Sequence, residues 1–183
     1  MQSTFQIEKR KRSIKQWLAF FMAMLIVSGI TVMPAEWELS IATKFFSEDS
    51  FIGSWLHEIY TAIRNTSSRY PYLFYGYDWL VFAHIVLAIA FVGPYKDPVK
   101  NKWVIEFGAI ACLLIIPFAL IAGYFRDIPF WWRLIDCSFG ILGLVPLGIC
   151  HNKIVELERM ENQSEKQFEE FNNLVTHQQN KLS

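Results

Sequence analysis

Residues 103–125, WVIEFGAIACLLIIPFALIAGYF, decide the fold class of this protein. The run is apolar apart from Glu106, and its length matches the roughly 20 residues that a helix needs to cross a bilayer core. A membrane β-barrel would instead show alternating segments of about ten residues each. The run therefore predicts a transmembrane helix.

Further runs of the same character predict an all-α, polytopic membrane bundle with four transmembrane helices. Five of the seven tryptophans open one of these runs, which is where amphipathic rings settle at a membrane interface. The predicted spans together form a membrane domain over residues 17–151. They cover about residues 17–34, 79–95, 103–125 and 130–150.

Lysine and arginine gather in two of the segments that flank the spans, and cytoplasmic flanks are enriched in these residues. Residues 1–16 hold five of them, and the turn between the second and third spans holds three more. The connection 35–77 has three basic residues against five acidic ones. We therefore expect residues 1–16 and 152–183 in the cytoplasm and the connection outside, with the chain in the cell (inner) membrane.

A basic start before an apolar run is also typical of a secretory signal peptide. The run is long for such a segment, and Val32-Met33-Pro34 lacks the small residues of a cleavage site, although Val27-Ser28-Gly29 offers a poor one. We expect an uncleaved anchor. Cleavage would leave three spans and an external N-terminus.

Two helices are expected outside the spans. In residues 50–64 apolar side chains recur at three and four, which predicts an amphipathic helix on the outer membrane face or over the bundle, before an interfacial turn from Asn65 to Tyr77. Residues 152–183 predict a cytoplasmic helix that continues the fourth span, either solvated or self-associating as an imperfect coiled coil. Its apolar seam consists of Ile154, Leu157, Phe168, Phe171, Val175 and Leu182.

Ionisable groups inside a bilayer cost about 2.5 to 3.5 kcal/mol each, so they indicate where a site lies. With a rise of about 1.5 Å per residue, His84 lies roughly 7 Å and Asp136 roughly 6 Å inside the outer ends of their spans. This shared depth predicts an outer-leaflet site for a polar head group, a small anion or a proton; the alternative is a structural ion-pair network. The predicted members are His84, Asp136, Arg133, Arg126, Asp127 and Asp78.

Two of these ionisable groups have predicted neighbours. Gly140 and Gly143 follow Asp136 at four and seven residues, so all three share a helix face that should point into the bundle, where small residues let helices approach. We expect Asp136 to pair with Arg133, Arg126 or His84. Glu106, four residues after Lys102, should pair with it at the inner end of the third span, or serve there as a proton-relay carboxylate.

No cofactor or metal is expected. Haem bound by two histidines would need them on facing helices at equal depth, and His84 alone lies within a span. The three cysteines occur singly, without a CxxC pair, and indicate small packing groups. A formal net charge of zero argues against nucleic acid as a partner.

These features predict a small accessory, assembly or binding subunit of a larger membrane system. Its expected partners are membrane lipid and either a second copy or other subunits, through the spans and residues 152–183. One alternative is a transporter or channel subunit for a small anion or proton, using Asp136, His84 and Glu106. Another is a membrane enzyme acting on a lipid head group with His84 as general base, but the lack of a nucleophile motif favours a non-catalytic role.

Overall fold

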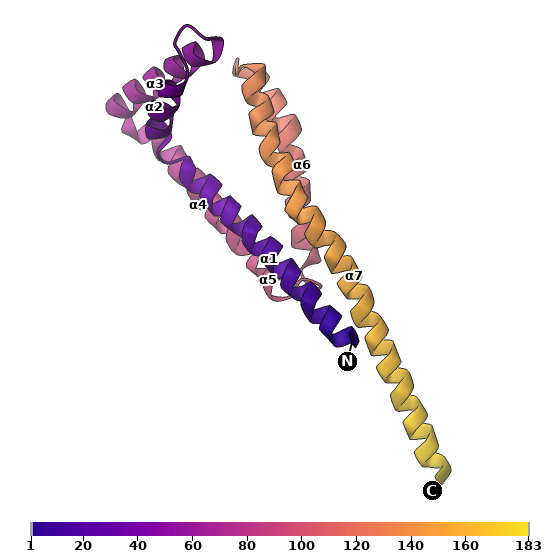
Figure 1. Cartoon of the computed structure of the whole chain (residues 1–183). Coiled ribbons are helices and arrows are strands. Elements are labelled where there is room, and N and C mark those ends of the chain that lie inside the picture. Colours follow the sequence, from indigo (N-terminus) through magenta and orange to yellow (C-terminus); the bar gives the residue numbers. More distant parts are fainter. Residues whose placement is uncertain (1, 183) are drawn as a thin grey trace. The chain divides into compact units, whose positions relative to one another are not determined.

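The computed structural model describes residues 2–182, and every regular element within them is a helix. Its side chains are described for residues 5–170 and 172, so the predicted seam positions Phe171, Val175 and Leu182 lie outside the described side chains. The elements, drawn in Figure 1, are α1 (Gln2–Thr31), α2 (Ala35–Phe45), α3 (Phe51–Arg69), the 3₁₀ helix η1 (Pro71–Phe74), α4 (Tyr75–Ala90), α5 (Val92–Lys96), α6 (Lys102–Phe125) and α7 (Phe130–Leu182).

Four helical segments are long and apolar enough to cross a membrane. This confirms the predicted all-α fold with four membrane-crossing helices, and it is compatible with an integral membrane protein. α7 also continues without a break from the predicted fourth span into the tail. The four segments are Phe5–Thr31, Pro71–Lys96, Lys102–Phe125 and Phe130–Glu170.

The chain divides into two compact units, and α1 contributes to both. The hairpin unit consists of residues 22–90, with the end of α1, the α2–α3 hairpin, η1 and α4. The tail unit consists of the residues up to 21 and from 91 onward, with the start of α1, α5, α6 and α7. Each unit is described by itself.

Glycines set the contact between α6 and α7 in the tail unit. A methyl group placed on Gly140 would lie 2.5 Å from the Cys112 carbonyl oxygen, and one on Gly143 would lie 2.7 Å from Cys112 Sγ. A methyl group on Gly108 would likewise lie 2.6 Å from Phe91 Cζ and 3.1 Å from Leu147 Cδ1. Gly140 and Gly143 therefore face the neighbouring helix, as their spacing predicts, because their missing side chains let the two backbones approach.

In the hairpin unit, the connection between α1 and α4 is more helical than predicted (Figure 1). α2 was not expected, and α3 continues to Arg69, past the predicted end at residue 64. The predicted turn from Asn65 to Tyr77 is therefore wrong over most of its length. Ser67 and Ser68 lie within this helical extension, and the Ser68 hydroxyl donates to the Asn65 carbonyl of the same helix at 3.1 Å.

The α2–α3 hairpin is held by polar contacts at both ends. Ser50 caps α3 by accepting a hydrogen bond from the Gly53 amide at 3.0 Å, and Ser67 donates to the Glu36 carboxylate of α2 at 2.8 Å. Gly53 and Leu56 are the buried residues of α3. The hairpin thus has almost no apolar interior of its own.

Candidate functional site

The turn between α6 and α7 contains two of the predicted site residues, Arg126 and Asp127. α6 ends in a Schellman arrangement, in which the Ile128 amide donates to the Gly123 carbonyl at 2.9 Å and the Asp127 amide to the Tyr124 carbonyl at 3.3 Å. Asp127 takes the left-handed conformation, with φ of 53°, that glycine usually supplies there. Asp127 therefore ends a helix, and both it and Arg126 are exposed.

Arg133, in the first turn of α7, stabilises the same connection. Its Nε donates to the Ile128 carbonyl at 2.7 Å, and its guanidinium lies 6.0 Å from the centre of the Tyr124 ring. The aliphatic stem fills the space beside Gly123, where a methyl group would lie 2.8 Å from Arg133 Cδ. Arg133 is thus a structural part of the turn, and its Nε is already used by the backbone.

Asp136 lies one turn of helix further along α7 and is half-buried. In the described part of the chain its carboxylate forms no hydrogen bond or ion pair with Arg133 or Arg126. The expected pairing with these arginines is therefore wrong. The reason is geometric: Arg133 turns back toward the Ile128 carbonyl and the Tyr124 ring, away from the turn of helix that carries Asp136.

His84 and Asp78 belong to the hairpin unit, whereas the other four predicted members belong to the tail unit. His84 shares a hydrogen bond of 2.8 Å between Nδ1 and the Leu80 carbonyl. It lies where α1 and α4 come closest, since a methyl group on Gly29 would be 2.6 Å from His84 Cβ. Asp78 is exposed in the first turn of α4. A joint site of all six residues stays a prediction.

The other end of the α6–α7 pair carries polar contacts that the sequence did not reveal. Glu106 lies 3.5 Å from His151 Nε2 of α7, and Lys102 Nζ lies 3.0 Å from Glu158 Oε2. The predicted pair between Lys102 and Glu106 is therefore wrong. Both residues reach across to polar side chains of α7, which runs antiparallel to α6 and presents His151 and Glu158 at the same level.

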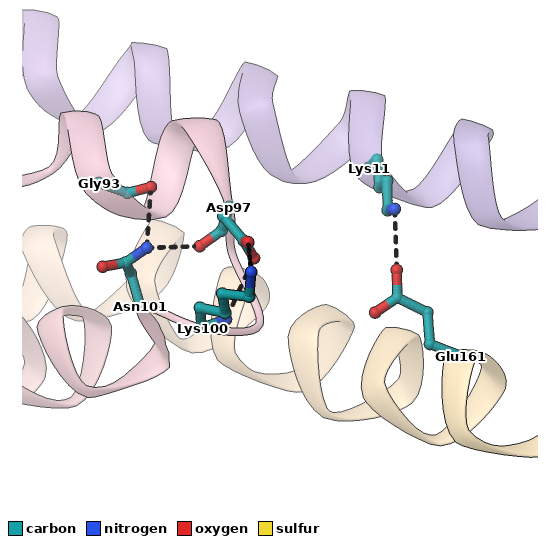
Figure 2. Close-up of polar contacts among 6 residues, drawn as sticks. All are labelled: Lys11, Gly93, Asp97, Lys100, Asn101 and Glu161. Atoms are coloured by element: carbon teal, nitrogen blue, oxygen red, sulfur yellow. Dashed lines mark hydrogen bonds and ion pairs between the residues drawn. The ribbon is translucent and has the colours of Figure 1, made fainter. Parts of the chain in front are cut away.

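The start of α1 adds further contacts to α7 at this end. Arg10 pairs with Glu156, Lys153 donates to the Ser13 hydroxyl, and Lys11 Nζ lies 2.8 Å from Glu161 Oε1 (Figure 2). We call the six charged residues that join α1 and α6 to α7 the ionic brace: Arg10, Lys11, Lys102, Glu156, Glu158 and Glu161.

An apolar seam lies beside the ionic brace. Ile14 and Leu18 of α1 and Ile154 and Leu157 of α7 all have no exposed surface, and Cys150 Sγ lies 3.9 Å from the Ile14 carbonyl oxygen. Each pair is spaced by three or four residues, so the signal is present in the sequence. The sequence of residues 1–16 nevertheless predicts only the topology, because the apolar spacing of one helix does not show which other helix it packs against.

The turn that leads into α6 is closed by its own side chains. Asn101 Nδ2 donates to the carbonyls of Asp97 at 2.9 Å and Gly93 at 3.3 Å, and the Lys100 amide donates to Asp97 Oδ1 at 3.2 Å (Figure 2). Lys100 also pairs with the same carboxylate. These bonds fix the start of α6, and so the level at which Lys102 meets Glu158.

The described residues do not bring together three His, Cys, Asp or Glu side chains that could hold a metal ion. Comparison of the chain with protein-family models, with curated proteins and with solved structures gives no match. The best-defined polar arrangement in the structure is therefore the ionic brace. It joins three helices, whereas the predicted outer residues of the tail unit serve mainly to end α6 and begin α7.

Proposed function

We propose that this chain is a four-pass protein of the cell inner membrane that acts as an accessory or assembly subunit, presenting the far part of α7 to another protein. The observation that carries the proposal is that α7 is packed against other helices along part of its length and exposed beyond it. The helix is held by the apolar seam and the ionic brace as far as Glu161, and the described side chains of residues 162–170 beyond it are all exposed.

Such support matters because binding a partner costs conformational entropy. A free helix of this polar composition is marginal in water, since helix formation needs a costly nucleus. Here the helix grows from a membrane span and is packed against α1 and α6 before it emerges. A preformed helix loses less entropy on binding, which favours a role in recognition.

The polar groups of the tail unit support binding over transport. Asp136 and the Glu106–His151 pair mark opposite ends of the α6–α7 contact, about 22 Å apart along α7. Between them this contact is formed by apolar and small groups: Gly108, Cys112, Gly140, Gly143 and Leu147.

The orientation of the proposal follows from the basic flanks. The basic residues of α1 and of the turn before α6 lie at the end of the tail unit from which α7 emerges. Positively charged flanks stay in the cytoplasm. We therefore place the N-terminus and the tail of α7 there.

A truncation after Glu161 tests the proposal, because it removes the exposed tail and keeps the seam and the ionic brace. Full-length and truncated chains would be taken from native membranes in polymer-bounded lipid discs, and the mass of each particle measured. We expect a complex larger than the monomer for the full chain and loss of that complex on truncation, with unchanged resistance to alkaline carbonate extraction. Full-length particles that hold only the monomer would overturn the proposal, as would truncated particles of unchanged mass.

A further inference from the structure

An apolar stripe runs along α2 on the side turned away from α3. Trp37, Ile41 and Phe45 follow each other at intervals of four residues, and Trp37 and Phe45 are 66% and 80% exposed. Glu36 marks the side of α2 that faces α3, because it accepts the hydrogen bond from Ser67. At about 100° per residue, Ile41 lies roughly 140° around the helix from Glu36.

The hairpin loop extends this exposed surface. Phe46 and Phe51 flank the loop and are 43% and 75% exposed. Monomeric proteins rarely leave several large aromatic side chains in water on one short element unless the surface has a partner. The hairpin interior offers no alternative place for them, since no residue of α2 is buried and Gly53 and Leu56 are the buried residues of α3.

The chain itself keeps the hairpin at the membrane surface. Only residues 32–34 separate the end of α1 from the start of α2, and only Tyr70 separates α3 from η1, which runs directly into α4. Within the hairpin unit, α2 and α3 lie crosswise at the end of α1 and α4 (Figure 1). A helix held crosswise to two membrane-crossing helices, at the level where they end, lies along the interface.

We propose that the α2 stripe is a lipid-binding surface, with Trp37, Ile41 and Phe45 inserted among the acyl chains of the leaflet that α1 and α4 reach at this end. Lys44 and Glu38 flank the stripe, so their long side chains can reach the head groups while the stripe is buried. The occupant is neutral or zwitterionic lipid, because residues 35–70 carry five acidic and three basic side chains. The inference rests on the proposed insertion of α1 and α4, and is independent of the role of α7.

Spin labels on introduced cysteines test this surface. The variants Trp37→Cys and Phe45→Cys would carry a nitroxide in phosphatidylcholine vesicles, with Thr61→Cys on the exposed polar side of α3 as the matched control. The native Cys112, Cys137 and Cys150 are buried, and the unsubstituted protein treated with the same reagent measures any labelling of them. Labels at 37 and 45 should collide with oxygen and be shielded from a water-soluble nickel complex, whereas the label at 61 should show the reverse.

Each other result counts against the inference. Nickel accessibility at 45 equal to that at 61 would place the stripe in water, and shielding from both reagents would place it against protein. Higher salt should leave the pattern at 37 and 45 unchanged, because insertion is apolar; release by salt would contradict it. If the protein fails to float with the vesicles after alkaline carbonate, both this inference and the proposed function fall.

A second measurement uses the unsubstituted protein and so does not depend on how the variants fold. A phosphatidylcholine with a photoactivatable group on its acyl chain would be crosslinked in vesicles, and the labelled peptides identified by mass spectrometry. Adducts within residues 35–46 are expected. Adducts confined to α1, α4, α6 and α7 would overturn the inference.

Discussion

The two ends of the tail unit are packed by different means. Between α6 and α7, in the predicted spans, contact depends on missing side chains at Gly140 and Gly143. Where α1 meets the tail of α7, it depends on fully buried Ile14, Leu18, Ile154 and Leu157 with the ionic brace beside them. In lipid, apolar side chains gain little by packing against each other instead of against acyl chains. Close backbone contact therefore decides whether two helices associate. Under the proposed topology the second contact lies in water, where removing apolar surface from the solvent is itself the driving force.

The largest effect is expected where α1 meets the tail of α7. Leu157→Ala should lower the free energy of unfolding by about 2–5 kcal/mol, because it removes a fully buried side chain and leaves a cavity. The measurement is an SDS titration in mixed micelles followed by circular dichroism. Phe168→Ala, at a position 65% exposed, is the control and should change stability by less than about 0.5 kcal/mol. Equal losses for both variants would show that Leu157 is not packed.

Within the membrane part, Gly140→Ala should cost about 1–3 kcal/mol, since its new methyl group would lie 2.5 Å from the Cys112 carbonyl oxygen and must push α6 away. Gly148→Ala is the matched control on the same helix, with nothing within 4 Å of the added group. It should stabilise α7 by up to about 1 kcal/mol through helix propensity. The same titration compares the two, and a stabilising Gly140→Ala would contradict the close approach.

At the turn, Asp127→Gly should stabilise the protein by about 1 kcal/mol, because glycine adopts a φ of 53° without the strain of a side chain. Asp127→Ala should give no such gain, because alanine keeps the strain of a side chain at this φ. Thermal unfolding in detergent would rank the three proteins. If glycine were the least stable, the carboxylate would have to contribute something besides the helix end.

The smallest effect is expected for one pair of the ionic brace. A double-mutant cycle with Lys11→Gln and Glu161→Gln should give a coupling energy below about 1 kcal/mol, because both side chains are 36% exposed. A coupling that survives high salt would show that the pair is more shielded than its exposure indicates.

The sequence predicts those parts of the structure that one helix can specify alone. Four apolar runs gave the membrane-crossing helices, and the spacing of Gly140 and Gly143 gave the face of α7 that meets α6. Partners on a second helix were harder to predict. Lys102 has Glu106 four residues away, yet it pairs with Glu158, 56 residues further along the chain.

Two further features were missed because their local signals are weak. α2 carries three apolar residues at intervals of four, which are too few to specify a helix by their period alone. Asp127 ends α6 in a conformation for which glycine is the usual marker, so the end of the helix had no glycine to indicate it. Its charge instead placed it among the site residues.

α7 runs as one helix from Phe130 to Leu182, about 80 Å long, although Pro146 within it has no amide proton to donate. A partner bound to the far end of α7 would therefore be connected through one helix to the packing of Ile154 and Leu157 and to the Gly140–Cys112 contact. Under the proposed topology, this helix would couple a partner in the cytoplasm to contacts within the bilayer.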